Sequence, residues 1–117
     1  MLFLAPILAA TAAPLPPAQQ RLTSCYISNV YRMSASNEPV SVVADTVLAL
    51  CSHLEQDARS EIIEETIQNL MQDGSTQYHE AKRVVHSIED KSYSDWRYRY
   101  RGLIQSQIIR VRQDSGQ

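Results

Sequence analysis

The feature that most constrains this chain is a helical spacing of apolar residues along most of its length. From residue 18 to residue 112, apolar side chains recur at steps of three and four, the pattern of a buried face on an amphipathic helix. Residues that interrupt helices are scarce, because the 117 residues include three glycines and five prolines, and no proline follows Pro39. The pattern predicts an all-α fold and argues against a turn-rich β-sandwich or barrel.

Polar breaks separate the first expected helices. The first helix spans 18–33 and ends at a polar stretch over 34–38. Pro39 suits the first turn of a second helix, which is expected to run to Leu54. The inward positions expected on these two helices are Leu22, Cys25, Tyr26, Val30, Met33, Val40, Val43, Ala44, Val47, Leu50, Cys51 and Leu54.

The second half of the chain predicts further helices. Asp57 is an expected N-cap for a third helix that Gly74 ends, and Ser75 is an expected cap for a fourth. A fifth helix is expected over 96–112 after a polar break at 90–95; one long kinked helix is the alternative, but serines in the break favour two. These elements predict a compact bundle of four to five helices. The inward positions expected here are Ile63, Thr66, Ile67, Leu70, Tyr78, Ala81, Val84, Val85, Ile88, Trp96, Tyr100, Leu103, Ile104, Ile108 and Val111.

The N-terminal segment is typical of an export signal. It carries no charged side chain, and its apolar run is followed by Ala10, Thr11 and Ala12, which supply the small residues that signal peptidase requires before a cut after Ala12. A buried helix or a membrane anchor is the alternative, although about a dozen apolar residues are too few to span a bilayer. The expected organisation is a signal peptide at 1–12, a Pro-rich extended leader at 13–18, a helical domain at 19–113 and a flexible tail at 114–117.

The two cysteines, Cys25 and Cys51, are the only ones in the chain. An even number of cysteines in a short exported chain predicts a disulfide, here one that ties the first two helices together. In the chain-entropy model the closed loop of 26 residues contributes about 3.5 kcal/mol of stability. A zinc site is disfavoured because no close cysteine or histidine pair accompanies them, and a catalytic thiol would need an adjacent base.

Charge is distributed unevenly along the chain. Nine acidic residues and one basic residue lie between Glu38 and Glu80, whereas eight basic and three acidic residues lie between Lys82 and Arg112. One interpretation is that the two halves pack side by side and neutralise each other. The other is a polarised surface that meets a partner of opposite charge.

The segment 93–101, with the sequence YSDWRYRYR, interleaves four aromatic residues with three arginines. These residue types are enriched at protein–protein hot spots and could also contact anionic lipid or single-stranded nucleic acid. The alternative is that Trp96 and Tyr100 belong to the core while the arginines lie in water. The candidate partner-binding residues are Trp96, Arg97, Tyr98, Arg99 and Arg101.

Motifs of catalysis and cofactor binding are missing from the sequence. His79 and His86 are seven residues apart, which on one helix separates them by about 10 Å, too far to share a metal. Glu61, Glu64 and Glu65 lack the Glu-x-x-His pattern of a di-iron bundle. No metalloprotease, serine-hydrolase, P-loop or dinucleotide-binding signature occurs. We therefore expect a protein without catalytic residues, metal or cofactor, and the near-neutral charge argues against nucleic acid as a partner.

The layout resembles that of small secreted or periplasmic helical proteins of Gram-negative bacteria. The resemblance lies in the Ala-rich leader, Cys25-Tyr26, the stretch at 42–45, Cys51 and the final amphipathic helix at 103–111. It implies export and a helical fold, but no reaction. Some disulfide-tied helical proteins of the periplasm are immunity proteins against toxins, although no diagnostic motif of that class is present here.

Two hypotheses of function follow from the sequence. The first is a non-catalytic periplasmic or secreted module that binds or inhibits another protein. The second is a cell-envelope protein that contacts anionic lipid or polymer through the arginines of its last helix, Arg97, Arg99, Arg101, Arg110 and Arg112. Salt should abolish the second kind of binding far more readily than the first. The sequence does not indicate an oligomeric state.

Overall fold

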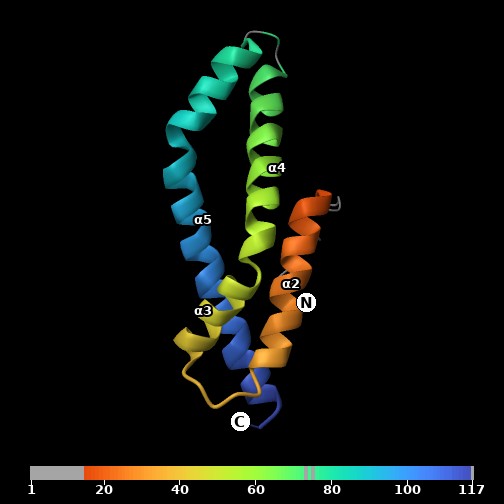
Figure 1. Ribbon diagram of the computed structural model, residues 1–117, viewed down its shortest axis with the longest axis vertical. Coiled ribbons are helices and arrows are strands. Elements are labelled where there is room, and N and C mark those ends of the chain that lie inside the picture. The colour runs from red at the N-terminus through yellow and green to blue at the C-terminus, as the bar shows by residue number, and fades with distance from the viewer. Residues whose placement is uncertain (1–14, 73, 75, 117) are drawn as a thin grey trace.

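The computed structural model describes residues 15–72, 74 and 76–116, and within these ranges it contains α-helices and no strand, which confirms the all-α prediction. The helices of this part of the chain are α2 (Pro17–Met33), α3 (Val40–Leu50), α4 (Ser52–Met71) and α5 (Tyr78–Asp114). α5 runs antiparallel to α4, while α2 and the short α3 lie beside their lower half (Figure 1). The predicted signal peptide at 1–12 and the predicted cap Ser75 fall outside the described residues.

A single helix of 37 residues, α5, replaces the expected fourth and fifth helices. The predicted break at 90–95 is wrong, because these residues continue the helix. Serine disfavours a helix by only about 0.5 kcal/mol per residue, and contacts from α4 hold the region in place. The guanidinium of Arg59 lies 2.9 Å from a carboxylate oxygen of Glu89 and 3.1 Å from one of Asp90.

The boundary between α3 and α4 lies at Cys51, several residues before the expected one. α3 ends at Leu50 and α4 begins at Ser52. Asp57 is therefore an exposed residue inside α4, so its prediction as an N-cap is wrong. The apolar pattern continues unbroken through this turn, which is why it suggested one helix as far as Leu54.

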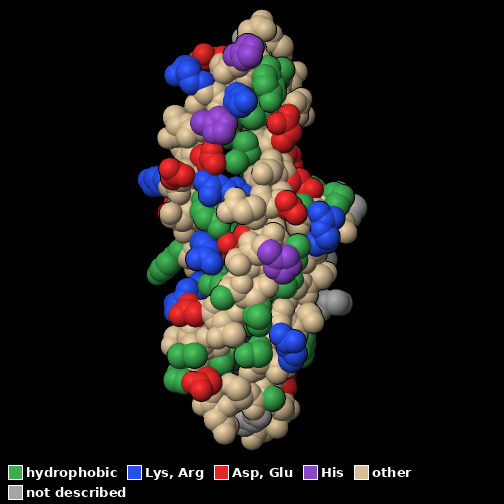
Figure 2. All heavy atoms as spheres, viewed as in Figure 1, with side chains coloured by type: hydrophobic (Ala, Val, Ile, Leu, Met, Phe, Trp, Pro, Cys, Tyr) green, Lys and Arg blue, Asp and Glu red, His purple; other side chains and the backbone are tan. Residues whose placement is uncertain are grey.

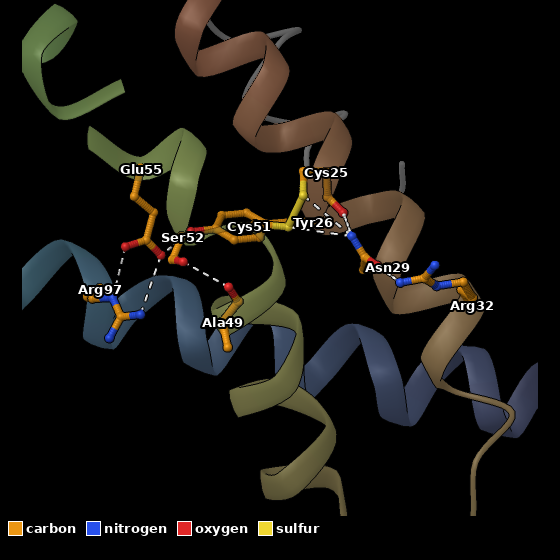
Figure 3. The surroundings of a disulfide bond; sticks show 9 residues. All are labelled: Cys25, Tyr26, Asn29, Arg32, Ala49, Cys51, Ser52, Glu55 and Arg97. Carbon is orange, nitrogen blue, oxygen red and sulfur yellow. Dashed lines mark hydrogen bonds and ion pairs between the residues drawn. A yellow bond between two sulfur atoms is a disulfide. The ribbon is translucent and has the colours of Figure 1, made fainter. Parts of the chain in front are cut away.

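The disulfide fixes this turn to α2 (Figure 3). Cys25 lies in the middle of α2, and its Cα is 5.9 Å from that of Cys51. The side-chain amide of Asn29 lies 3.4 Å and 3.6 Å from the two sulfur atoms. The predicted Cys25–Cys51 bond is thus present, and it joins α2 to the residue between α3 and α4.

In the part of the chain that the structure describes, two apolar clusters hold the helices together. The larger one lies at the base, where α2, α3, the start of α4 and the end of α5 meet; its buried members are Ala18, Leu22, Tyr26, Val30, Val43, Ala44, Val47, Leu48, Cys51, Ala58, Ile104 and Ile108. The smaller one joins only α4 and α5, through Ile67, Ala81 and Val85, with Ile63 and Met71 packed against them. The upper part of the α4–α5 pair therefore extends beyond α2 and α3 (Figure 1).

α2 begins against the middle of α4. The carboxylate of Glu61 accepts hydrogen bonds from the backbone N–H groups of Ala18 and Gln19, each at 3.0 Å. Partial burial opposes the charge, but these two bonds hold the pKa of Glu61 below its usual value. An acidic group at the first turn also interacts favourably with the helix dipole. Because α2 begins at this contact, α2 covers only the half of α4 that lies before Glu61 in the sequence.

The ends of the described helices differ slightly from the expected domain limits. α2 already begins at Pro17, within the expected leader, and α5 extends to Asp114, the first residue of the expected tail. In the part of the chain that the structure describes, no helix has both the length and the apolar character needed to cross a bilayer.

Candidate binding site

The predicted partner-binding residues lie on different sides of α5. Trp96 and Tyr100 are partly buried against the larger cluster, with their ring centres 4.8 Å apart. Tyr98 is 81% exposed, and Arg99 also lies in solvent. The segment therefore combines core residues with exposed ones, as helical periodicity requires.

Two arginines of this segment hold α5 against its neighbours. Nε of Arg97 lies 3.2 Å from a carboxylate oxygen of Glu55 on α4, and Nε of Arg101 lies 2.8 Å from one of Asp45 on α3. The hydrogen bond from Arg101 lowers the pKa of Asp45. These arginines therefore join helices, and the five predicted residues do not lie on one face of α5.

Glu55 is the centre of a buried polar network. Its side chain is 4% exposed, and it accepts hydrogen bonds from the hydroxyl of Tyr26 at 3.2 Å and that of Tyr93 at 2.6 Å. Figure 3 shows Glu55 facing Arg97 across the space between α4 and α5. Burial, followed by the nearby carboxylate, raises the pKa values of both tyrosines. The network joins three helices, because Tyr26 belongs to α2.

A layer of charged and aromatic groups lies directly above this network. The guanidinium of Arg59 is 4.2 Å from the ring centre of Tyr93, a geometry in which cation and ring attract each other. Glu89 binds Arg59, and its second oxygen lies 2.6 Å from Nδ1 of His86. Arg59 therefore links α4 to α5 at the level where the larger cluster ends.

Between the two apolar clusters, α4 and α5 leave a cavity of about 210 Å³. We call it the α4–α5 groove. Its apolar lining consists of Ile62 and Ile63 from α4 and Val85, Ile88, Tyr93 and Trp96 from α5. Arg59, Glu89, Thr66 and Ser92 supply the polar part. Such a space, mostly apolar with a few polar groups, is suited to binding an apolar side chain or a small apolar ligand.

Large apolar side chains are exposed in the same half of the α4–α5 pair. Ile88 is 53% exposed, and Leu70, Tyr78 and Val84 are each close to 40% exposed. All four were expected to point into the core, so those predictions are wrong. The reason is geometric: the apolar pattern gives a face of each helix, and α4 and α5, the helices described in this half, cover only part of each other's apolar face.

The uneven charge distribution is balanced in part by contacts between helices. The ion pairs Arg97–Glu55 and Arg101–Asp45 join basic residues of α5 to the acidic part of the chain, whereas Arg59–Glu89 joins the basic residue of that part to an acidic residue of α5. On the face drawn in Figure 2, basic and acidic side chains alternate along the long axis. The pairs of Arg97 and Arg101 agree with the interpretation in which the two halves neutralise each other, and the pair of Arg59 does not bear on it.

The residues considered for metal chemistry are not brought together. His79 and His86 are exposed on α5, and no three His, Cys, Asp or Glu side chains among the described residues are placed to hold a metal ion. Glu55, the most deeply buried carboxylate described, is occupied by three donors from the chain itself.

No protein-family model, curated protein or solved structure matches this chain.

Sequence reasoning missed both the groove and the network beneath it. The groove depends on how far α5 diverges from α4, which a helical pattern does not specify. One signal was available: Ile62 and Ile63 are adjacent, so two neighbouring faces of α4 are apolar. A helix with a widened apolar face needs either more neighbours or a partner.

Proposed function

We propose that this protein is an exported, non-catalytic module that binds another polypeptide through the α4–α5 groove. The observation that carries the proposal is the groove itself, an apolar space of about 210 Å³ beside an isoleucine that is 53% exposed. Exposed apolar surface next to a pocket is typical of sites that accept an anchor side chain from a partner. The disulfide supports an oxidising compartment such as the periplasm or the extracellular space.

The alternative, contact with anionic lipid or polymer through the arginines of α5, has less support. Arg97 and Arg101 form ion pairs with Glu55 and Asp45. Arg112 donates hydrogen bonds to the backbone carbonyl groups of residues 34, 36 and 38. Of the five arginines in that hypothesis, these three would have to give up contacts within the chain, whereas Arg99 and Arg110 are exposed.

The groove can be tested with a matched pair of substitutions on α5. Ile88 lines the groove, whereas Ile109, 45% exposed on the same helix, is not among the groove residues. A partner captured by the wild-type protein from its host should be purified and titrated against the wild type, Ile88→Glu and Ile109→Glu. We expect Ile88→Glu to weaken binding about 30-fold or more, as loss of a hot spot does, and Ile109→Glu to leave it unchanged. Equal affinities for all three proteins would contradict the proposal.

Binding can also be followed by fluorescence. Trp96 is the only tryptophan, and it lines the groove. A partner side chain entering the groove should shift its emission to shorter wavelength. The export part of the proposal has its own measurement: the protein from its native host should begin at Ala13, and an intact Met1 form in the cytoplasm would refute it.

A further inference from the structure

The two halves of the Cys25–Cys51 bond differ in their access to solvent. Cys51 is 0% exposed, because it lies within the larger apolar cluster at the turn between α3 and α4. Cys25 is partly exposed on α2 and packs against the edge of that cluster. A thiolate opens a disulfide by attacking one of its two sulfur atoms, and access decides which one is attacked. In the folded chain, the route from solvent to this bond therefore leads to Cys25.

An open depression in the surface adjoins Cys25. Besides Cys25 it is lined by Pro17, Gln20, Arg21 and Ser24 from α2 and by Leu54 from α4. Arg21 is exposed and lies four residues before Cys25, so the two share a face of α2. A cation beside a cysteine favours thiolate chemistry there. The carboxylate of Glu61, whose pKa Arg21 helps to lower, is held by the first backbone N–H groups of α2.

The buried sulfur atom is placed to leave and to return. The side-chain amide of Asn29 lies 3.4 Å from Sγ of Cys25 and 3.6 Å from Sγ of Cys51. Its N–H group can therefore donate a hydrogen bond to the thiolate that Cys51 becomes when the bond opens. α2 is also held by its buried side chains and by the hydrogen bond from Tyr26 to Glu55, which do not need the disulfide. Cys51 thus stays beside Cys25 and can close the bond again.

We propose that the Cys25–Cys51 pair is a site of reversible exchange with external thiols, in which the mixed disulfide forms at Cys25. A thiolate attacks Sγ of Cys25, the Cys25–Cys51 bond breaks, and Cys51 leaves as a thiolate that takes up a proton. A second thiolate, from the same molecule or another, attacks the external sulfur of the mixed disulfide and releases Cys25. The bond of the chain is thereby reduced to two thiols while two external thiols are oxidised to a disulfide, and the reverse sequence installs the bond. The site shares no residue with the α4–α5 groove.

Mapping the mixed disulfide on the purified, oxidised protein tests the proposal. The probes are reduced glutathione and a thioredoxin in which serine replaces the second active-site cysteine, so that its mixed disulfide persists. After short reaction times, free thiols are alkylated in acid and peptides are identified by mass spectrometry; trypsin separates the two cysteines by cutting at Arg32. We expect adducts on Cys25 at least about tenfold more often than on Cys51 in the folded protein, and a ratio of about one in denaturing guanidinium chloride, where both sulfur atoms are accessible.

Single-cysteine variants measure the same difference in access without the bond. The Cys25 thiol that remains in Cys51→Ala should react with a chromogenic disulfide reagent at least about tenfold faster than the Cys51 thiol that remains in Cys25→Ala. Circular dichroism checks that both variants keep their helices. If either variant unfolds, the adduct map of the wild type decides alone.

The proposal fails if the folded wild type carries adducts equally on both cysteines or mainly on Cys51. It also fails if neither probe opens the bond until denaturant unfolds the chain, because exchange would then require unfolding. Adducts of both probes on Cys25 support exchange with small thiols and with protein dithiols. An adduct of glutathione without one of thioredoxin supports Cys25 as the attacked residue and excludes the protein dithiol as its reactant.

Discussion

Replacement of Glu55 by Gln tests the network that joins α2, α4 and α5. The substitution keeps the shape of the side chain but removes the charge that three donors share, those of Tyr26, Tyr93 and Arg97. A hydrogen bond to a charged group contributes about 1 kcal/mol more than a neutral one. The Arg97 side chain is 42% exposed, so water replaces part of its share. We expect the free energy of unfolding to fall by about 2–3 kcal/mol.

The assay is urea denaturation followed by far-ultraviolet circular dichroism. Asp57→Asn is the matched control, because Asp57 is an exposed carboxylate on the same helix and its neutralisation should change stability by less than about 0.5 kcal/mol. Tyr26→Phe leaves Glu55 with two donors. It should lower the free energy of unfolding by about 1 kcal/mol, which is more than Asp57→Asn and less than Glu55→Gln. If Glu55→Gln were as stable as the control, the reasoning about a buried shared charge would be wrong.

Three further predictions concern stability. Reduction of Cys25–Cys51 should lower the free energy of unfolding by about 3.5 kcal/mol, from the loop of 26 residues; urea curves with and without reductant measure it, and coincident curves would contradict it. Trp96→Ala should cost about 3 kcal/mol, because the ring packs on the core; an unchanged melting temperature would place Trp96 outside it. Burial raises the pKa of Tyr26 above its ordinary value of 10.0, so the contribution of Tyr26 to stability is complete below pH 10 and is lost as the pH rises beyond it. The ultraviolet absorbance of tyrosinate should show that Tyr26 ionises at higher pH than an ordinary tyrosine. A single ordinary transition for all tyrosines would contradict this.

The sequence predicted what depends on spacing within one helix. Leu22, Tyr26 and Val30 recur every four residues and are all buried, and Ile104 and Ile108 follow the same rule on α5. The disulfide could also be predicted, because it needs only two cysteines and an oxidising context.

Features that depend on distant segments could not be predicted in this way. Glu55 is buried only because Arg97, 42 residues away, and two tyrosines surround it. Helical periodicity gives the face on which Ile88 lies but not whether a third helix covers that face. The break expected at residues 90–95 failed for the same reason, since Arg59 on α4 binds Glu89 and Asp90 there.

The continuity of α5 has a consequence for how the protein opens. One uninterrupted helix passes through a large cluster at the base and a small one near its start. The free energy needed to open a turn of α5 therefore differs along its length. Backbone amides near Ala81 should exchange their hydrogens through local opening, whereas those near Ile104 and Ile108 should exchange only when the whole chain unfolds. The contacts of Arg59 with Glu89 and Asp90 lie between these regions and set the point where local opening stops. The base, with its disulfide, can therefore stay folded while the upper turns of α4 and α5 separate and rejoin.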